Sequence, residues 1–379
     1  MSDPRYRELA RLLVNHSTHL EAGEPVLIES THIPPSMITA LVEEASARGA
    51  VAVVDIKDHT LQRSLLKTGS AELVRSRMKL MGEIELFRME KVKAYIGLRG
   101  SHNITEMSDV PGELMSIYEH EWMKPVHLER RVKHTRWVVL RWPNGSMAQL
   151  AGMSTQAFED FYFRVCLCDY AAMEKAVQPL KEMMQRTDRV RIVGPDTDLR
   201  FSIKGVGVVP CTGTHNVPDG ECFTAPVRDS IEGHIHFNSG SIYRGTPFDD
   251  VRLTFEKGKV IQASSSNDEA LRAILDTDEG ARYVGEFAIA FNPFIEKPMR
   301  DILFDEKIRG SLHLALGQCY EETENHNRSS VHWDLVLRQE SGGELWFDDT
   351  LVRQDGRFVV EALQGLNPEN LAGRQPALV

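Results

Sequence analysis

The sequence lacks long apolar runs and blocks of basic residues. No run reaches the ~18 apolar residues that a membrane-spanning helix needs. The first residues, MSDPRYRELARLL, contain neither the uninterrupted apolar segment nor the small-residue cleavage site of a signal peptide. The net charge is −11, and no Lys/Arg-rich block occurs. Because non-specific affinity for nucleic acids is mainly electrostatic, the sequence predicts a protein with neither a membrane nor a nucleic-acid partner.

Cysteine is scarce, and its spacing shows no paired motif. The chain contains five cysteines, an odd number, and no CxxC pair. This argues against a disulfide framework and against a thiolate zinc site, and predicts reduced thiols in the cytoplasm. A glycine-rich GxGxxG motif is also missing after the first predicted strand, so a dinucleotide site has no support.

The composition predicts two globular domains. The chain has 379 residues, of which 42% are hydrophobic and 26% charged, values typical of soluble globular proteins. Domains usually contain roughly 100–200 residues, so two are expected. The texture of the sequence changes near Thr187, which predicts an N-terminal domain over residues 1–186 and a C-terminal domain over residues 187–379.

The first half alternates short apolar segments with helical segments. This order favours an α/β domain with a mostly parallel sheet that is covered on both faces. Asp3 is expected to cap a helix that begins at Pro4, and Ser154 to cap another. The predicted strands are Val26–Glu29, Val51–Ile56, Ala94–Leu98 and Trp137–Trp142, and the predicted helices are Ser36–Arg48, Leu61–Leu80, Glu113–Arg130 and Ala171–Arg186.

The second half is rich in hairpin signals. Turns are expected in GPDTD, at Lys257-Gly258, at Asp348-Asp349 and at Asp355-Gly356. One short helix, DEALRAILD, follows Asn267 as its N-cap. These features predict a β-rich α+β domain.

Two strands of this domain carry residues with metal-binding chemistry. In LHLALG, Leu312, Leu314 and Leu316 alternate with His313 and Ala315. In VHWDLVL, apolar residues alternate with His332 and Asp334. Both segments are predicted strands with one apolar face. The two histidines and the aspartate would lie on faces that can meet.

Three glutamates occur in unusual surroundings nearby in the sequence. Glu221 lies in a loop bounded by glycine and proline, Glu286 begins a strand beside small alanines, and Glu306 precedes His313. Clustered carboxylates repel one another unless a cation lies between them. A ligand set of oxygen and nitrogen without sulfur suits zinc, manganese or cobalt. Spacing alone leaves open the alternative of polar residues on ordinary solvated strands.

Four segments, in order, resemble the aminopeptidase T family of metallo-aminopeptidases: NVPDGECFTAP, EGARYVGEFAIAFNP, ILFDEKIRGSLHLALGQCYEE and NRSSVHWD. LAGMSTQAFEDFYFR in the first half is also similar. Compared with thermophilic members, the segment between Glu306 and His313 is longer, and the loop from Tyr320 to His332 is shorter. The resemblance implies that Tyr320 is an active-site residue. The metal ligands that it implies are Glu221, Glu286, Glu306, His313, His332 and Asp334.

The resemblance also implies a mechanism and an assembly. Two divalent ions per chain, zinc first and cobalt or manganese as alternatives, would bind the α-amine of a short peptide and activate a bridging water. Glu286 is our choice for the bridging carboxylate. Tyr320 would donate a hydrogen bond to the oxyanion, and a free oxygen of Glu221 or Glu286 would act as base. A homodimer with enclosed active sites is implied.

Two other classes of protein remain open. Iron-dependent dioxygenases that cleave dihydroxypyridine rings have a similar fold and hold one Fe(II) with a His, His-x-Asp set. His313, His332 and Asp334 would satisfy that set, whereas Glu221 and Glu286 would then have no function. The third class is a non-catalytic binding protein, which would not need the complete ligand set.

Overall fold

The computed structural model of the protein describes residues 3–372. It divides into two compact units. The first contains the chain up to Leu167 together with Gly213–Val217, and the second contains Cys168–Thr212 and the chain from Pro218 onward. The boundary therefore precedes helix α9 (Tyr170–Arg186), which the sequence analysis placed in the first domain.

The first unit is built on a five-stranded parallel sheet. Its strand order is β2-β1-β3-β4-β8, and every pairing is parallel, as predicted. The last strand comes from the distant segment that returns to this unit. The strands are β1 (Pro25–Thr31), β2 (Val51–Lys57), β3 (Ala94–Arg99), β4 (Arg136–Arg141) and β8 (Asn216–Val217).

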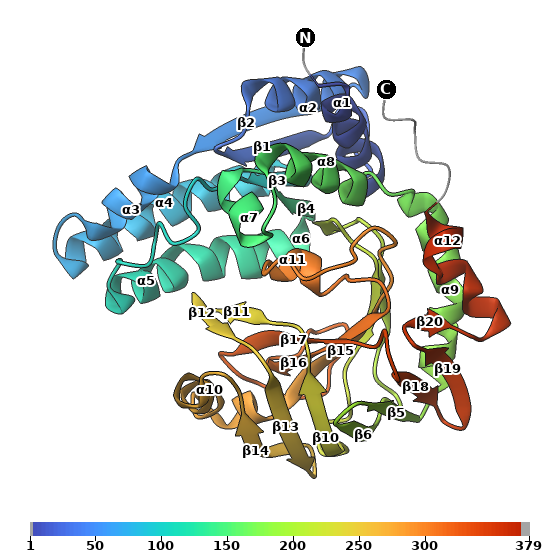
Figure 1. The fold of residues 1–379 in the computed structure, drawn as a ribbon. Helices are drawn as coiled ribbons and strands as arrows, with labels where there is room; N and C mark the ends of the chain where they lie inside the picture. Colours follow the sequence, from blue (N-terminus) through green and yellow to red (C-terminus); the bar gives the residue numbers. More distant parts are fainter. Residues whose placement is uncertain (1–2, 373–379) are drawn as a thin grey trace. The chain divides into compact units, whose positions relative to one another are not determined.

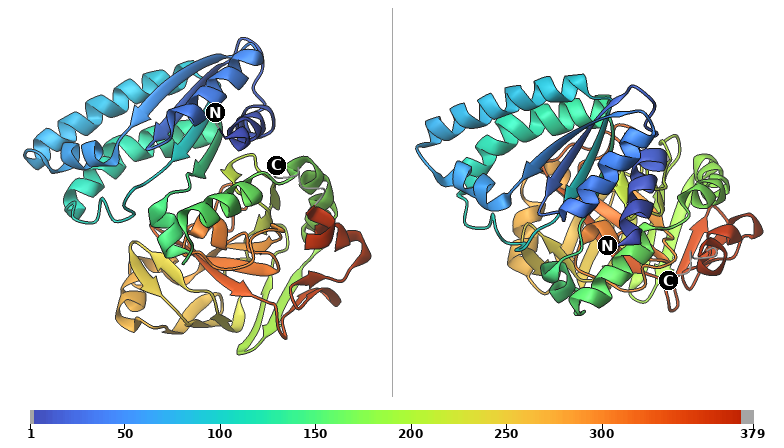
Figure 2. Two further views of the ribbon diagram at one scale, coloured as in Figure 1. Left: turned by 45° about the horizontal axis from the view of Figure 1, so that its top comes forward. Right: turned by 90° about the horizontal axis from the view of Figure 1, so that it is seen from above.

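Helices cover both faces of this sheet (Figures 1 and 2). Leu27, Tyr95 and Val139 share one face and pack against Met89 of α4 and Trp122 of η2. The dark-blue helices α1 and α2 lie on the other face in Figure 2. The helical segments are α1 (Pro4–Arg11), η1 (Leu12–Ser17), α2 (Pro35–Ala47), α3 (His59–Lys67), α4 (Ala71–Lys91), α5 (Gly112–Tyr118), η2 (Glu119–Arg131), α6 (Val132–His134), α7 (Gly145–Leu150) and α8 (Thr155–Cys166).

The helix caps agree with the sequence, but one predicted helix is interrupted. The side chains of Asp3 and Ser154 accept hydrogen bonds from the first turns of α1 and α8, as expected. The predicted helix over Leu61–Leu80 is wrong, because the chain breaks between α3 and α4. Gly69 has a φ of +104°, and Ser70 caps α4. The predicted helix over Glu113–Arg130 is confirmed, because α5 continues directly into η2 over these residues.

Within residues 3–372, the second unit contains a larger and a smaller antiparallel sheet, a two-stranded antiparallel sheet of β11 and β12, and a few helices (Figure 1). The larger sheet has the order β14-β13-β10-β6-β5-β18-β19-β20, and the smaller sheet has the order β17-β16-β15-β9-β7. Its strands are β5 (Arg189–Gly194), β6 (Thr197–Ser202), β7 (Val209–Cys211), β9 (Glu221–Thr224), β10 (Glu232–Phe237), β11 (Ser241–Tyr243), β12 (Thr246–Phe248), β13 (Val251–Glu256), β14 (Lys259–Ser264), β15 (Val284–Ala290), β16 (Ser311–Gly317), β17 (His332–Arg338), β18 (Glu344–Phe347), β19 (Thr350–Gln354) and β20 (Arg357–Phe358).

The predicted hairpins and the β-rich second half are confirmed. Lys257 and Gly258 both have positive φ between β13 and β14, as a tight hairpin turn requires. Asn267 caps α10. Besides α9, the helical segments are α10 (Asp268–Leu275), η3 (Glu279–Arg282), α11 (Ile302–Asp305), η4 (Glu361–Leu366) and α12 (Pro368–Leu371). No helix within residues 3–372 has the length and apolar character to cross a membrane.

The smaller sheet is held from behind by apolar packing and one buried arginine. Phe287 of β15 meets Phe201 of β6 with ring centroids 5.1 Å apart. The guanidinium of Arg353 donates to the carbonyls of Ala290 and Ser311, where β15 ends and β16 begins. Strands β15 and β16 are buried at every residue, so the predicted single apolar face was too simple for them. This packing fixes the strands that carry the candidate ligands.

Candidate metal centre

One face of the smaller sheet carries most of the candidate ligands. Paired residues on adjacent strands point to the same face, as do residues two apart along a strand. Glu286 pairs with Ala315, which pairs with Asp334. Ala288 pairs with His313, Ala290 with Glu221, and Gly317 with His332. The register therefore brings together three carboxylates and two imidazoles over small residues. The sequence predicted a loop at Glu221, but the structure places it as the first residue of strand β9.

A glycine bulge directs Glu286 into this face. The pairing of β15 with β16 shifts register between Val284 and Glu286. A Cβ on the intervening Gly285 would lie 2.4 Å from the carbonyl oxygens of Gly317 and Gln318. Only glycine fits there, so the backbone can approach closely and the following side chain is re-aimed.

Glu286 and Asp334 each face both histidines. The two carboxylate oxygens of Glu286 lie 3.4 Å from Nε2 of His313 and 3.4 Å from Nε2 of His332. Oδ1 of Asp334 lies 3.8 Å and 3.5 Å from the same two nitrogens. Two carboxylates thus span two imidazoles, which is the arrangement needed to bridge two neighbouring cations.

The backbone fixes which nitrogen of each histidine faces the carboxylates. Nδ1 of His332 lies 2.9 Å from the carbonyl oxygen of Gln318, and Nδ1 of His313 lies 3.3 Å from that of Glu306. When Nδ1–H donates to a carbonyl, Nε2 keeps its lone pair for a ligand position. Both Nε2 atoms point to Glu286 and Asp334.

Glu221 and Glu306 are joined by a lysine that the sequence analysis overlooked. Lys307 follows Glu306 at the end of α11, and its side chain is 1% exposed. Its ammonium donates to Oε1 of Glu221 at 2.9 Å and to Oε1 of Glu306. It lies 4.0 Å from Oδ1 of Asp219. The sequence did offer one sign of this lysine's role, because in the segment FDEK it directly follows the candidate ligand Glu306.

Burial and mutual charge displace the pKa values of the cluster. Burial raises the pKa of Glu221 to about 8 and also raises the pKa of Glu306. Burial lowers the pKa of His313, but its contacts with Glu286 and Glu221 outweigh this and raise it to about 10. Burial likewise opposes ionisation of Asp334, yet the neighbouring His332 imidazolium holds the pKa of Asp334 below its usual value. Protons therefore supply the positive charge that a divalent cation would provide.

Tyr320 borders this cluster at its accessible side. Its hydroxyl lies 3.5 Å from Nε2 of His332, and its ring packs edge-on against those of His332 and Phe223. Tyr320 is 46% exposed, more than His332, whose side chain is 28% exposed. The phenol can therefore meet a molecule that enters from solvent.

The residues fit divalent cations. Donor atoms of Glu286, His332 and Asp334 lie within 4.8 Å of one another, as do those of Glu306, His313 and Asp334. Asp334 belongs to both groups. One oxygen of Glu221, Oε2, is buried without a hydrogen-bond partner, which leaves a carboxylate oxygen open to a cation. Oxygen and nitrogen donors without sulfur match zinc, cobalt and manganese.

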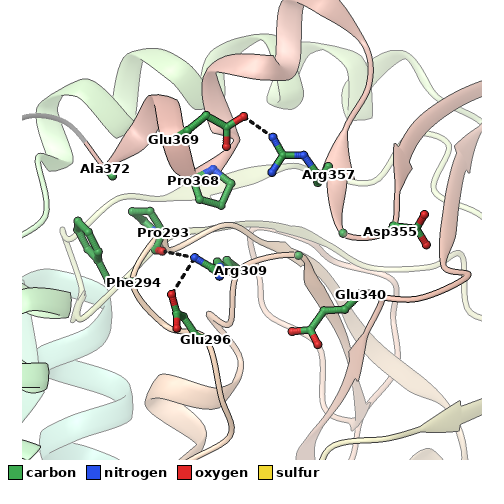
Figure 3. A pocket seen from close by; sticks show the side chains of 12 residues that line it. Pro293, Phe294, Glu296, Arg309, Glu340, Asp355, Arg357, Pro368, Glu369 and Ala372 are labelled. Atoms are coloured by element: carbon green, nitrogen blue, oxygen red, sulfur yellow. Dashed lines mark hydrogen bonds and ion pairs between the residues drawn. The ribbon is translucent and has the colours of Figure 1, made fainter.

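A separate surface pocket contains none of these residues. It has a volume of about 600 Å³ and lies between Pro293, Arg309, Glu340 and Pro368 (Figure 3). There Arg309 pairs with Glu296 at 2.9 Å, and Arg357 pairs with Glu369. Both of its arginines are paired with glutamates and it contains no histidine, so the cluster on the smaller sheet is the stronger candidate for metal chemistry.

Comparison with known protein families identifies the family of this chain. The model of the family described as thermophilic metalloprotease (M29) matches residues 2–345. The chain belongs to this family. The match covers both units, and the family resemblance inferred from the four sequence segments is confirmed.

Curated relatives agree over shorter segments. The chain is 34% identical to aminopeptidase T of Thermus thermophilus over 166 residues, which are 38% of this chain and 40% of that protein. It is 35% identical to aminopeptidase 2 of Geobacillus stearothermophilus over 144 residues, 32% of this chain and 34% of that protein. The matched segments thus span well under half of these relatives.

Solved structures share the fold over nearly the whole chain. The structure of AmpT from Thermus thermophilus matches with a TM-score of 0.80 at 23% identity, covering 94% of this chain and 99% of that one. A 2,5-dihydroxypyridine dioxygenase from Pseudomonas putida matches with a TM-score of 0.61 at 15% identity, covering 96% and 99%. The predicted fold class is confirmed, and the fold itself is compatible with two different chemistries.

Proposed function

We propose that this protein is a metal-dependent aminopeptidase that releases N-terminal residues from short peptides. The observation that carries the proposal is the pair Glu286 and Asp334, each facing both His313 and His332 on one sheet face of a metalloprotease-family chain. A site for a single ion needs no second carboxylate that spans the same two imidazoles.

We propose two divalent ions per chain, zinc first and cobalt or manganese as alternatives, held by Glu221, Glu286, Glu306, His313, His332 and Asp334. When bound, such ions supply Lewis acidity that polarises a scissile carbonyl and lowers the pKa of the attacking water. The backbone carbonyls of Gln318 and Glu306 hold the two histidines in the ligating orientation. Tyr320 donates a hydrogen bond to the carbonyl oxygen as negative charge develops there.

Binding of the α-amine by one of the proposed metal ions predicts selection of a free amino terminus. Acetylation converts the amine to an amide, whose nitrogen lone pair is delocalised and would not bind a metal ion. We expect hydrolysis of free dipeptides and tripeptides and a loss of at least about 10²-fold in kcat/KM for their acetylated forms, which is about 2.7 kcal/mol of lost binding in the transition state.

The measurement compares product release by mass spectrometry for matched free and acetylated peptides. Peptides blocked only by a C-terminal amide serve as controls and should be cleaved. Equal rates for acetylated and free peptides would exclude the aminopeptidase assignment while leaving an endopeptidase.

We also propose that the protein forms a homodimer through the first unit. Helix α4 exposes Leu80, Ile84 and Phe87 at 58–63%, spaced along one helix face, and the edge strand β2 exposes Ile56 at 73%. Contiguous apolar surfaces of this kind mark protein interfaces.

The five cysteines are free thiols, which supports our assignment to the reducing cytoplasm.

Sedimentation velocity tests the dimer. The wild type should sediment as a dimer, and Ile84→Glu combined with Phe87→Glu should give monomers with unchanged circular dichroism. A charge change on an exposed polar residue of the same helix, Glu83→Lys, is the control. A monomeric wild type would refute this part of the proposal.

A ring-cleaving dioxygenase is the second candidate, favoured by the shared fold and by His313 and His332, whose Nε2 atoms both lie within 3.8 Å of Asp334. It would hold one Fe(II) and consume oxygen. Elemental analysis of the purified chain, together with oxygen uptake on a dihydroxypyridine, separates the two. One iron per chain with ring cleavage would replace the peptidase assignment.

A further inference from the structure

Lys307 occupies a place among the carboxylates that would suit a cation. Donor atoms of Cys211, Asp219 and Glu221 lie within 4.8 Å of one another, a spacing that would also suit a metal ion. The Lys307 ammonium lies beside this group, 2.9 Å from Glu221 and 4.0 Å from Asp219. Its side chain is buried, and burying an unpaired ammonium costs several kcal/mol. The carboxylates are what keep it there.

The contacts of Lys307 divide the candidate ligands unequally. Its ammonium contacts Glu306, which belongs to the group with His313 and Asp334. In the part of the chain that the structure describes, Lys307 forms no ion pair with Glu286 or Asp334 of the other group, although its charge still lowers the pKa of Asp334 from a longer distance. A divalent ion entering the Glu306 group would therefore meet a carboxylate already partly neutralised, beside a like charge. An ion entering the Glu286 group would feel the ammonium charge only from beyond direct contact, through Asp334.

We propose that Lys307 is a built-in monovalent cation that makes the two metal positions unequal. The position formed by Glu286, His332 and Asp334 fills first and tightly. The position that uses Glu306 and His313 fills second and weakly, because its ion competes with the ammonium for Glu306 and Glu221. The inference rests on the metal centre of the proposed function but concerns binding order and not catalysis.

The competing explanation is that Lys307 is only a structural counter-ion for Glu221 and Asp219. Both explanations predict that its loss alters the stability of the metal-free protein. They differ in metal affinity. Competition predicts that removing the ammonium strengthens binding of the second ion, whereas a purely structural role predicts unchanged or weaker binding.

The test is titration of the metal-free protein with Co²⁺, followed by visible absorbance and calorimetry. In the wild type we expect two dissociation constants that differ by at least about tenfold, as a charge a few ångströms from one site requires. In Lys307→Met, the dissociation constant of the weakly bound ion should fall by about tenfold or more, and that of the tightly bound ion should change by less than about threefold. Lys307→Gln keeps a hydrogen-bonding group without charge and carries the same test if the methionine variant does not fold.

Arg309→Met is the matched control. It removes one positive charge from the same segment, but Arg309 pairs with Glu296 in the separate surface pocket (Figure 3). Both constants should remain as in the wild type. The inference would be overturned if the wild type bound two Co²⁺ ions with equal affinity. It would also be overturned if neither Lys307 variant bound the second ion more tightly than the wild type does. The protein could bind two Co²⁺ ions with unequal affinity, lose that difference in Lys307→Met, and still cleave no peptide. This result would support the inference about binding order and refute the proposed peptidase activity.

Discussion

Replacing Glu286 by glutamine should remove metal from both positions and abolish peptidase activity. The two carboxylate oxygens of Glu286 lie at equal distances of 3.4 Å from the ligating nitrogens of His313 and His332. The amide is isosteric but uncharged, and its nitrogen cannot coordinate. We expect kcat/KM to fall by roughly 10³-fold or more, because a bound metal contributes several kcal/mol to the transition state.

Elemental analysis after mild dialysis measures the metal directly. The wild type should retain up to two ions per chain, and Glu286→Gln should retain neither. Asp334→Asn should behave in the same way, since Asp334 belongs to both donor groups. Glu221→Gln should weaken mainly one position.

Glu344→Gln, on the distant strand β18, is the control and should retain metal and activity. Full metal content in Glu286→Gln would show that Glu286 is not a ligand. Loss of metal in the control as well would point to a general defect in folding.

Replacing Tyr320 by phenylalanine should separate catalysis from metal binding. The change deletes one hydroxyl at the accessible side of the cluster and no ligand. If that hydroxyl stabilises the oxyanion, kcat should fall by roughly 10²–10³-fold, as for the loss of one such donor. KM and metal content should change little, because the interaction forms only in the transition state.

The measurement pairs steady-state kinetics on a short peptide with elemental analysis. Tyr243→Phe is the matched control, since Tyr243 stacks on Trp333 with ring centroids 5.1 Å apart and, within residues 3–372, forms no hydrogen bond with a candidate ligand. A metal-depleted Tyr320→Phe would make Tyr320 a ligand or a support for His332. Unchanged kcat would remove it from the mechanism.

The sequence alone predicted the strands that carry most of the candidate ligands, because strand periodicity is local. Alternation of apolar residues around His332 and Asp334 places both on one side of a strand, whatever the strand pairs with. The alanines that follow Glu286 likewise revealed a face with room for a bulky group. Helix caps at Asp3 and Ser154, and the turn at Lys257-Gly258, are also decided by neighbouring residues, so they too were predicted.

Only the tertiary structure decided how these residues meet. The row Glu286, Ala315, Asp334 depends on the register of three strands distant in sequence and on the bulge at Gly285. No local pattern contains that register. For the same reason the sequence could not show that Asp334 is shared between two donor groups, or that Lys307 reaches Glu221 across 86 residues of chain. A buried charge is explained by its partners in space, and those partners are fixed by folding.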